Sequence, residues 1–224
     1  MIGGVFLNHE TQINAVIGFA QSKLGSDVTG HGMDHLHRVA QLATHLAKEE
    51  GIDPFLPITI SYLHDTIDDK LIDDVDQAIA EVKTFLQTQN YQPAEQDEIM
   101  TTITQMSFAS TLGNQRLKLS LAGQIVQDAD WLDALGATGI SRAIYYGGKH
   151  HQVIYDPKIA PRMKMDKSEY RNLDHETIIN HFYEKLFKLP AMLNTTSAKK
   201  IANEREAFMH QFIDRFLAEW DGKA

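Results

Sequence analysis

The sequence predicts an all-α protein, and three observations support this fold class. Apolar residues recur at spacings of three and four along most of the chain, which is the period of an amphipathic helix. Glycine and proline stand mainly between these periodic segments, where helices begin and end. No stretch shows a convincing alternation of apolar and polar residues, which would be typical of a strand. We therefore expect a single helical bundle over residues 1–224.

The expected helices are placed by their apolar faces and by the residues that end them. The first covers 12–24 and stops at Gly25, and the second ends at Gly51. A third begins near 54–58, where an aspartate followed by a proline suits a helix start. Further helices are expected at 74–88, 93–108, 119–135, 139–146, 174–189 and 197–220.

Two boundaries in the second half of the chain carry specific expectations. The pair Gly147-Gly148 is expected to close the helix over 139–146. Residues 149–173 contain two prolines and many charges without either period, and we expect a long loop there. Because no linker, repeat or charge block divides the chain, one domain is the simplest organisation.

Composition excludes several classes of protein. Of the 224 residues, 43% are hydrophobic and 23% are charged, as in an ordinary globular protein. The absence of cysteine excludes disulfides, thiolate metal sites and a cysteine nucleophile. The net charge of −9 argues against nonspecific nucleic-acid binding, and no apolar run is long enough for a membrane span. The N-terminus lacks the features of a secretory signal, so the simplest expectation is a cytoplasmic protein.

Histidine and aspartate side chains gather in three widely separated segments. Each segment lies on or beside an expected amphipathic helix, and facing helices build internal metal sites from inward side chains. Imidazole and carboxylate groups suit Mn, Fe, Co, Ni, Zn or Mg rather than soft metals. Two of the residues, His37 and Asp128, lie off the expected ligand faces and are predicted to be solvated. The three sets are His31, His35 and His37, then His64 and Asp65, then Asp128 and Asp130.

The chain resembles the HD-domain metal-dependent phosphohydrolase superfamily, whose signature is H…HD…D. His35, His64-Asp65 and Asp130 match this signature in order. The resemblance implies an HD-domain helical bundle, with the metal-site core at about 30–145 and C-terminal helices at about 174–220. It also implies that these four side chains ligate a divalent metal ion, with Mn, Mg or Co expected first and Fe, Ni or Zn as alternatives.

The flanking sequence extends the resemblance over about residues 30–215. The stretch His31-Gly-Met-Asp-His-Leu-His-Arg-Val39 is similar to the family's H-D-x-x-H-h-x-R-V motif, with Gly32 in place of the usual aspartate. The block 125–142 and the stretch 181–186 resemble one bacterial branch that includes nucleotide phosphohydrolases and pyrophosphohydrolases. The departure at Gly32 leaves the ligands intact, and Asp34 is a candidate to take over part of the missing side chain's role.

Further acids lie close to the expected ligands. Asp68 follows His64 by four residues and would share its face on a helix, so it is the first candidate for the general base. It also belongs to an acidic run that could simply be solvated, and Asp69 is a second candidate for the same role. Asp133, three residues after Asp130, is a candidate to orient a metal ligand through a hydrogen bond.

Several cationic side chains are candidates to receive the phosphate of a substrate at an acidic site. Each has a plainer interpretation as well, such as an ion pair between Arg38 and Asp34 or a solvated loop after Gly147-Gly148. The candidates are His31, Arg38, Lys70, Arg142, Lys149, His151, His181 and Lys185.

These residues predict a metal-dependent phosphohydrolase whose substrate is a small phosphorylated molecule. The reaction expected first is hydrolysis of a nucleoside or deoxynucleoside triphosphate to monophosphate and pyrophosphate by a metal-activated water. Because no histidine lies between 65 and 149, one metal ion is favoured over the two-metal site of a phosphodiesterase. Hydrolysis of (p)ppGpp and a non-catalytic nucleotide-sensing module are the alternatives. Nucleic acid and membrane are not expected as partners, and a homodimer is left open.

Overall fold

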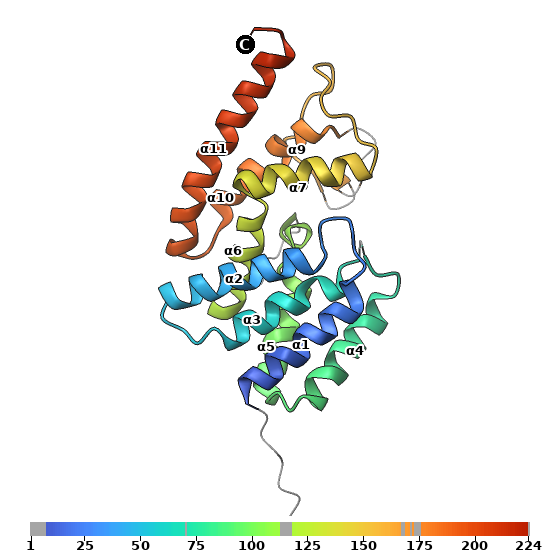
Figure 1. Cartoon of the computed structure of the whole chain (residues 1–224), viewed down its shortest axis with the longest axis vertical. Helices are drawn as coiled ribbons and strands as arrows, with labels where there is room; N and C mark the ends of the chain where they lie inside the picture. The colour runs from blue at the N-terminus through green and yellow to red at the C-terminus, as the bar shows by residue number, and fades with distance from the viewer. Residues whose placement is uncertain are drawn as a thin grey trace, which may run out of the picture. The chain divides into compact units, whose positions relative to one another are not determined.

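Helices joined by turns and loops make up the described parts of the chain (Figure 1). The computed structural model describes residues 8–69, 71–112, 118–166, 169–170, 172 and 176–223. Across those residues there is no strand, and the one β-type pairing is an isolated parallel bridge between Val153 and Thr177. The prediction of an all-α fold is confirmed. Within the same residues, no helix combines the length and the apolar character that a membrane span requires.

The contacts between Cα atoms divide the chain into two compact units, which are described separately. Unit 1 comprises Met1–Ser107 and Leu117–Val126, and unit 2 comprises Phe108–Arg116 and Gln127–Ala224. Helix α6, Leu121–Asp133, begins in unit 1 and ends in unit 2. One domain over residues 1–224 stays a prediction.

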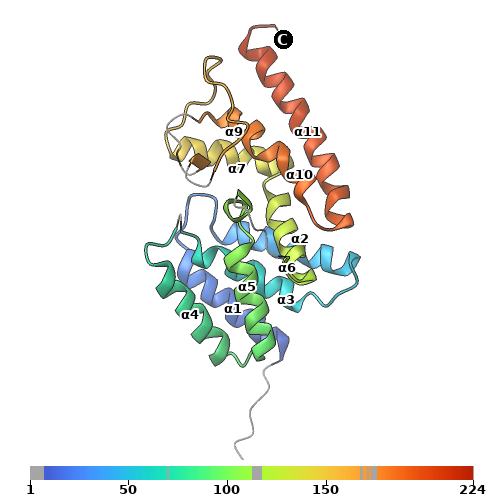
Figure 2. The same ribbon diagram turned by 180° about the vertical axis from the view of Figure 1, so that it is seen from behind.

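Unit 1 is organised around helix α3, Phe55–Leu63, which contacts α1, α2 and α5. Most of its residues are buried, as expected of a helix that is apolar on nearly all sides. Helices α1 and α4 lie side by side in both ribbon views (Figure 2). Phe19 of α1 stacks on Phe85 of α4, with 4.5 Å between ring centroids. The other elements of this unit are α1 His9–Leu24, α2 Met33–Glu49, the 3-10 helix η1 His64–Ile67, α4 Val75–Thr88 and α5 Pro93–Gln105.

Unit 2 is built on helix α7, Gly136–Lys149, which packs against α9 and α11. Threonine side chains begin two of its helices: Thr177 accepts a hydrogen bond from the Asn180 N–H, and Thr195 accepts one from the Ala198 N–H. The other elements are η2 Phe108–Leu112, α9 Ile178–Glu184, η3 Leu186–Lys188, α10 Leu189–Met192 and α11 Thr196–Trp220.

Two predicted helix boundaries are wrong. Gly147-Gly148 does not end a helix, because α7 continues to Lys149. A Cβ at Gly147 would lie 2.4 Å from Cγ1 of Ile178, so this glycine serves close packing of α7 against α9. The segment expected as one helix over 174–189 is instead α9, η3 and α10, and Pro190 near the start of α10 favours the break before it.

The end of α7 predicts a stabilising substitution. His151 has φ of 56°, in the left-handed region, and its N–H donates to the Gly148 carbonyl while the Gln152 N–H donates to the Gly147 carbonyl. Glycine is the preferred residue at this position after a helix, so His151→Gly should raise the free energy of unfolding by roughly 0.5–1 kcal/mol. Thermal melts should show a higher midpoint. Asn90→Gly, at the equivalent position after α4 with φ of 57°, should gain less because asparagine tolerates this conformation; equal gains would contradict the argument.

Candidate metal centre

Three side chains of unit 1 converge where α2 faces the turn that follows α3. Nε2 of His35, on α2, lies 3.3 Å from Nε2 of His64 and 3.4 Å from Oδ2 of Asp65. Nε2 of His64 lies 3.2 Å from Oδ1 of Asp65. All three residues are buried, with 0%, 6% and 5% of their surface exposed. Two imidazole nitrogens and a carboxylate in one buried space are a donor set that fits a divalent cation.

The backbone fixes which nitrogen of His64 faces this space. Nδ1 of His64 lies 2.8 Å from the carbonyl oxygen of Ser61. A carbonyl can only accept, so Nδ1 carries the proton and Nε2 presents its lone pair toward His35 and Asp65. Metal-ligating histidines commonly donate their other ring N–H to a backbone carbonyl in this way. The sequence offered no signal for this contact beyond the helical spacing of Ser61 and His64.

The surroundings of Asp65 favour its ionised form. Burial alone would raise the pKa of its carboxyl, but attraction to His64 and His31 and the hydrogen bonds from His31 and His35 hold that pKa well below its ordinary value. Nδ1 of His31 lies 3.0 Å from Oδ2 of Asp65. His31, His35 and Asp65 also form a group whose ligand atoms all lie within 4.8 Å of one another. The structure thus brings His31 to the predicted ligands.

The residues after Asp65 do not have the geometry that the sequence predicted. His64–Ile67 is a 3-10 helix, and Asp68 follows it with an extended backbone, φ −70° and ψ 124°. The expectation that Asp68 shares an α-helical face with His64 and Asp65 is therefore wrong. Asp68 is half-buried and Asp69 is exposed, and Lys70 lies outside the described residues.

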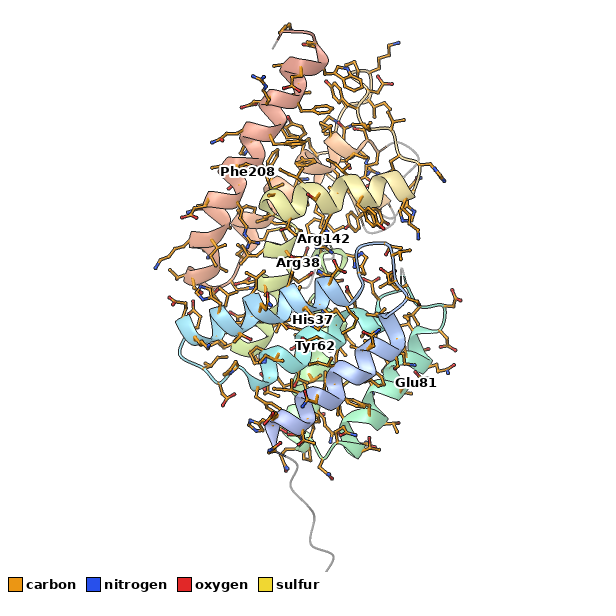
Figure 3. The ribbon with its side chains drawn as sticks, viewed as in Figure 1. His37, Arg38, Tyr62, Glu81, Arg142 and Phe208 are labelled. Atoms are coloured by element: carbon orange, nitrogen blue, oxygen red, sulfur yellow. The ribbon has the colours of Figure 1, made fainter. Side chains whose placement is uncertain are left out.

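Asp130 and Asp133 lie on the part of α6 that belongs to unit 2. Asp130 is half-buried. Asp133 is buried, and its Oδ2 lies 3.0 Å from a guanidinium nitrogen of Arg142 on α7, which is labelled in Figure 3. Two residues with separate predicted roles, Asp133 and Arg142, are therefore ion-paired with each other.

The prediction that Asp128 is solvated is wrong. Its carboxylate is fully buried and accepts four hydrogen bonds, from the N–H and side-chain amide of Asn194 and from the N–H and hydroxyl of Thr195. These two residues precede helix α11, so Asp128 anchors the start of that helix. Burial raises the pKa of Asp128 even though these four donors oppose the shift.

The cationic candidates differ in their surroundings. Arg38 donates to Asp34 at 2.8 Å across one turn of α2, which is the plainer of its two predicted interpretations. His37, which Figure 3 shows beside Tyr62, is exposed, and its Nδ1 lies 2.7 Å from the Tyr62 hydroxyl. Lys149 and His151 are exposed at the end of α7.

Two further candidates are His181, on α9, and Lys185, the residue directly after α9. Nδ1 of His181 lies 2.7 Å from the carboxylate of Glu176. Nζ of Lys185 lies 5.4 Å from the ring centroid of Phe108 and 5.7 Å from that of Tyr170, within the range of cation–π attraction.

Sequence reasoning missed an ionic network around the buried Glu184 in unit 2. The guanidinium of Arg162 donates to both carboxylate oxygens of Glu184, at distances from 2.6 to 3.1 Å, and to the backbone carbonyls of Glu169 and Asn172. Glu184 is 1% exposed. The network ties the loop that holds Arg162 to helix α9. Its one sequence signal was an acid inside an otherwise apolar helix face.

Glu176 in this region predicts a pH-dependent stability. Although burial raises its pKa, hydrogen bonding and charge from His181 and the charge of Arg162 lower that pKa below the ordinary value of 4.5. The unfolded chain then binds the proton more tightly, so this contribution to stability is present above pH 4.5 and is lost as the pH falls through the lower, folded-state pKa. Glu176→Gln should therefore flatten the dependence of unfolding free energy on pH in this acidic window. Urea titrations at several pH values would measure it, and an unchanged slope would contradict the assignment.

Comparison with known proteins places the chain in a family. The HD domain family model matches residues 32–135. The YpgQ protein of Bacillus subtilis is 34% identical over 202 residues, which cover 90% of each chain. A crystal structure from Lactobacillus plantarum shares 48% identity with a TM-score of 0.86, covering 95% of this chain and 98% of that one. The chain belongs to the HD domain family.

Two other solved structures bear on function. The crystal structure of YpgQ in complex with ADP shares 32% identity with a TM-score of 0.72, covering 92% of this chain and 96% of that one. An HD-superfamily hydrolase from Bacillus thuringiensis shares 33% identity with a TM-score of 0.74, covering 96% and 99% of the two chains. The predicted ligands His35, His64, Asp65 and Asp130 all fall within the residues that the HD domain model matches.

Proposed function

We propose that this chain is a metal-dependent phosphohydrolase that cuts a nucleoside or deoxynucleoside triphosphate into monophosphate and pyrophosphate. The observation that carries the proposal is the buried convergence of His35, His64 and Asp65, in which Ser61 orients one imidazole. A nucleotide substrate is supported by the similarity to YpgQ, which was crystallised with ADP. The hydrolase class is supported by the similarity to the Bacillus thuringiensis protein.

His35, His64, Asp65 and Asp130 are proposed to hold one Mn, Mg or Co ion. Asp130 enters this set on the strength of the H…HD…D resemblance and of its half-buried place on α6. When bound, a divalent ion supplies Lewis acidity, which lowers the pKa of water and polarises a phosphoryl oxygen. The protein's part is to keep the ligand atoms fixed, and the burial of His35 and Asp65 does this.

Asp68 is proposed to accept the proton of the attacking water, with Asp69 as the alternative. Asp68 follows the 3-10 helix directly, and its N–H donates to the Asp65 carbonyl at 3.2 Å, so its backbone is tied to a ligand residue. It is half-buried, whereas Asp69 is exposed. A base that is partly accessible can exchange its proton with solvent after each turnover.

Phosphate is proposed to meet cationic side chains that solvent can reach. Arg38 is the first of these in unit 1, since an exposed pair such as Arg38–Asp34 contributes only about 0–1 kcal/mol and can exchange for a phosphate. Arg142 is held by a buried carboxylate, so we assign it an orienting role through Asp133. The remaining candidates for phosphate are His31, Lys149, His151, His181 and Lys185. Lys70, which lies outside the described residues, is kept as a candidate from the sequence alone.

A panel of nucleotides incubated with Mn²⁺, Mg²⁺ or Co²⁺ tests the proposal, with pyrophosphate and orthophosphate measured separately. We expect pyrophosphate and a nucleoside monophosphate from at least one triphosphate. Release of orthophosphate alone would contradict the proposed bond, and release of pyrophosphate from (p)ppGpp but not from any triphosphate would select the alternative substrate. Nucleotide binding without hydrolysis of any compound would identify a sensing module and overturn the enzyme.

A further inference from the structure

The turn between α1 and α2 carries an aspartate that the function described above does not use. Oδ1 of Asp27 accepts hydrogen bonds from the Thr29 N–H at 2.8 Å and the His31 N–H at 3.1 Å. The Thr29 hydroxyl lies 2.9 Å from Oδ2 of the same carboxylate. One side chain thus fixes the backbone from 27 to 31.

This turn is packed closely on the start of α2. A Cβ at Gly32 would lie 2.8 Å from the carbonyl oxygen of Asp27, so any larger residue at position 32 would push the turn away. Gly32 begins the helix without a side-chain cap. Position 32, where this chain has glycine instead of the aspartate of the family motif, is therefore the position against which the Asp27 carbonyl packs.

The turn ends at His31, which reaches the metal centre. Nδ1 of His31 lies 3.0 Å from Oδ2 of Asp65, and the two side chains are 19% and 8% exposed. At this distance Nδ1 of His31 is within hydrogen-bond reach of Oδ2, so the position of His31 constrains where this oxygen lies. The other oxygen, Oδ1, faces Nε2 of His64. The two oxygens of Asp65 therefore contact different histidines, Oδ2 with His31 and Oδ1 with His64.

We propose that Asp27 is a positioning residue: by fixing the 27–31 turn it holds His31 against Oδ2 of Asp65 and so sets the direction in which Asp65 meets a metal ion. The inference rests on the metal site of the proposed function. Residues that orient a ligand from behind typically change metal affinity by about 10–100-fold when they are removed. Asp27 acts through its acceptor oxygen, since both backbone N–H groups donate to Oδ1.

Four variants and Co²⁺ as the probe test this role, with titration followed by the visible absorption of the bound ion. We expect Asp27→Ala to weaken Co²⁺ binding by about 10-fold and to alter the spectrum. Asp27→Asn keeps the acceptor at Oδ1, and because asparagine and aspartate are about equally good caps it should bind within about two-fold of wild type. His31→Ala should match Asp27→Ala, and the double variant Asp27→Ala/His31→Ala should be no weaker than His31→Ala alone.

Asp74→Ala is the matched control, because Asp74 also accepts a backbone N–H, from Gln77 at 2.9 Å, and begins α4. It should lower the melting temperature as Asp27→Ala does, with unchanged Co²⁺ affinity. If Asp27→Ala melts below the assay temperature, Thr29→Val, which removes the hydroxyl donor, takes its place with an expected weakening of about 3-fold.

Three results would overturn the inference alone. The first is wild-type Co²⁺ affinity in Asp27→Ala or in its substitute. The second is equal weakening in Asp27→Asn, which would show that the charge of Asp27 matters rather than its acceptor oxygen, and the third is additive losses in the double variant. A wild-type protein that binds no Co²⁺, Mn²⁺ or Mg²⁺ would overturn the proposed function, and this inference with it.

Discussion

Replacing Asp65 by asparagine should abolish metal binding and lower hydrolysis by about 10³-fold or more. Asparagine keeps the size of the side chain but removes the charge that lies 3.2 Å from Nε2 of His64 and 3.4 Å from Nε2 of His35. A catalytic metal typically supplies several kcal/mol of transition-state stabilisation, and each 1.36 kcal/mol is worth a factor of ten. Metal content per chain and initial rates with the best substrate of the panel would measure the two effects.

A control separates this loss from damage to the fold. Asp65 also accepts hydrogen bonds from His31 and contacts His35 and His64, so Asp65→Asn removes charge from a buried cluster. We expect a lower melting temperature but an unchanged helical circular dichroism spectrum at 25 °C. Asp74→Asn, which alters the exposed start of α4, should retain full metal content and rate. Full activity or unchanged metal content in Asp65→Asn would contradict the ligand assignment.

The convergence of the predicted ligands of unit 1, His35, His64 and Asp65, could be predicted because their sequence pattern is short and their helices are strongly periodic. Leu36, Val39 and Ala43 place the apolar face of α2 unambiguously, and all three are buried. His35 is adjacent to this face and is therefore buried with it. The apolar run of α3 carries His64 and Asp65 into the same core.

The details around those ligands could not be predicted because they depend on single hydrogen bonds. After Leu63 the chain changes from α to 3-10 geometry, where the Thr66 hydroxyl donates to the Leu63 carbonyl at 2.6 Å. Periodicity does not register a change of this size over four residues, so the sequence pattern predicts the wrong face for Asp68. The orientation of His64 likewise depends on the Ser61 carbonyl, which carries no sequence signal.

The burial of Asp128 could not be predicted for a different reason. Helix α6 is buried on more than one side, with Val126, Ala129 and Trp131 all at most 2% exposed. A helix without a solvated face has no period that separates buried from exposed polar residues. The rule that residues two positions apart face different surroundings therefore did not apply to Asp128 and Asp130.

The network around Arg162 was beyond sequence reasoning because the loop over 149–173 has no period. Arg162 lies in that loop, and its partner Glu184 is 22 residues away on α9. Only the folded loop brings the two charges together. The pairing of Arg162 with Glu184 is the basis of the second large effect that we expect, on the free energy of unfolding of unit 2.

Glu184→Ala should lower the free energy of unfolding of unit 2 by about 3–5 kcal/mol, because it leaves the charge of Arg162 without its buried carboxylate partner. Both tryptophans of the chain, Trp131 and Trp220, belong to unit 2, so urea unfolding followed by their fluorescence reports on this unit. Breaking one partner of such a pair costs more than the pair itself contributes, because Arg162, whose side chain is only 22% exposed, keeps a longer ion contact, at 3.8 Å to Glu176.

The double variant Arg162→Met/Glu184→Met distinguishes this explanation from a simple loss of contacts. It removes both charges while keeping apolar volume, so it should recover much of the stability that Glu184→Ala loses. The carbonyls of Glu169 and Asn172, which Arg162 contacts at exposed positions, can turn to water. Glu219→Ala, which breaks the exposed Arg215–Glu219 pair, should change stability little. If the double variant were as unstable as Glu184→Ala, the network would act through its hydrogen bonds to the loop rather than through the balance of buried charge.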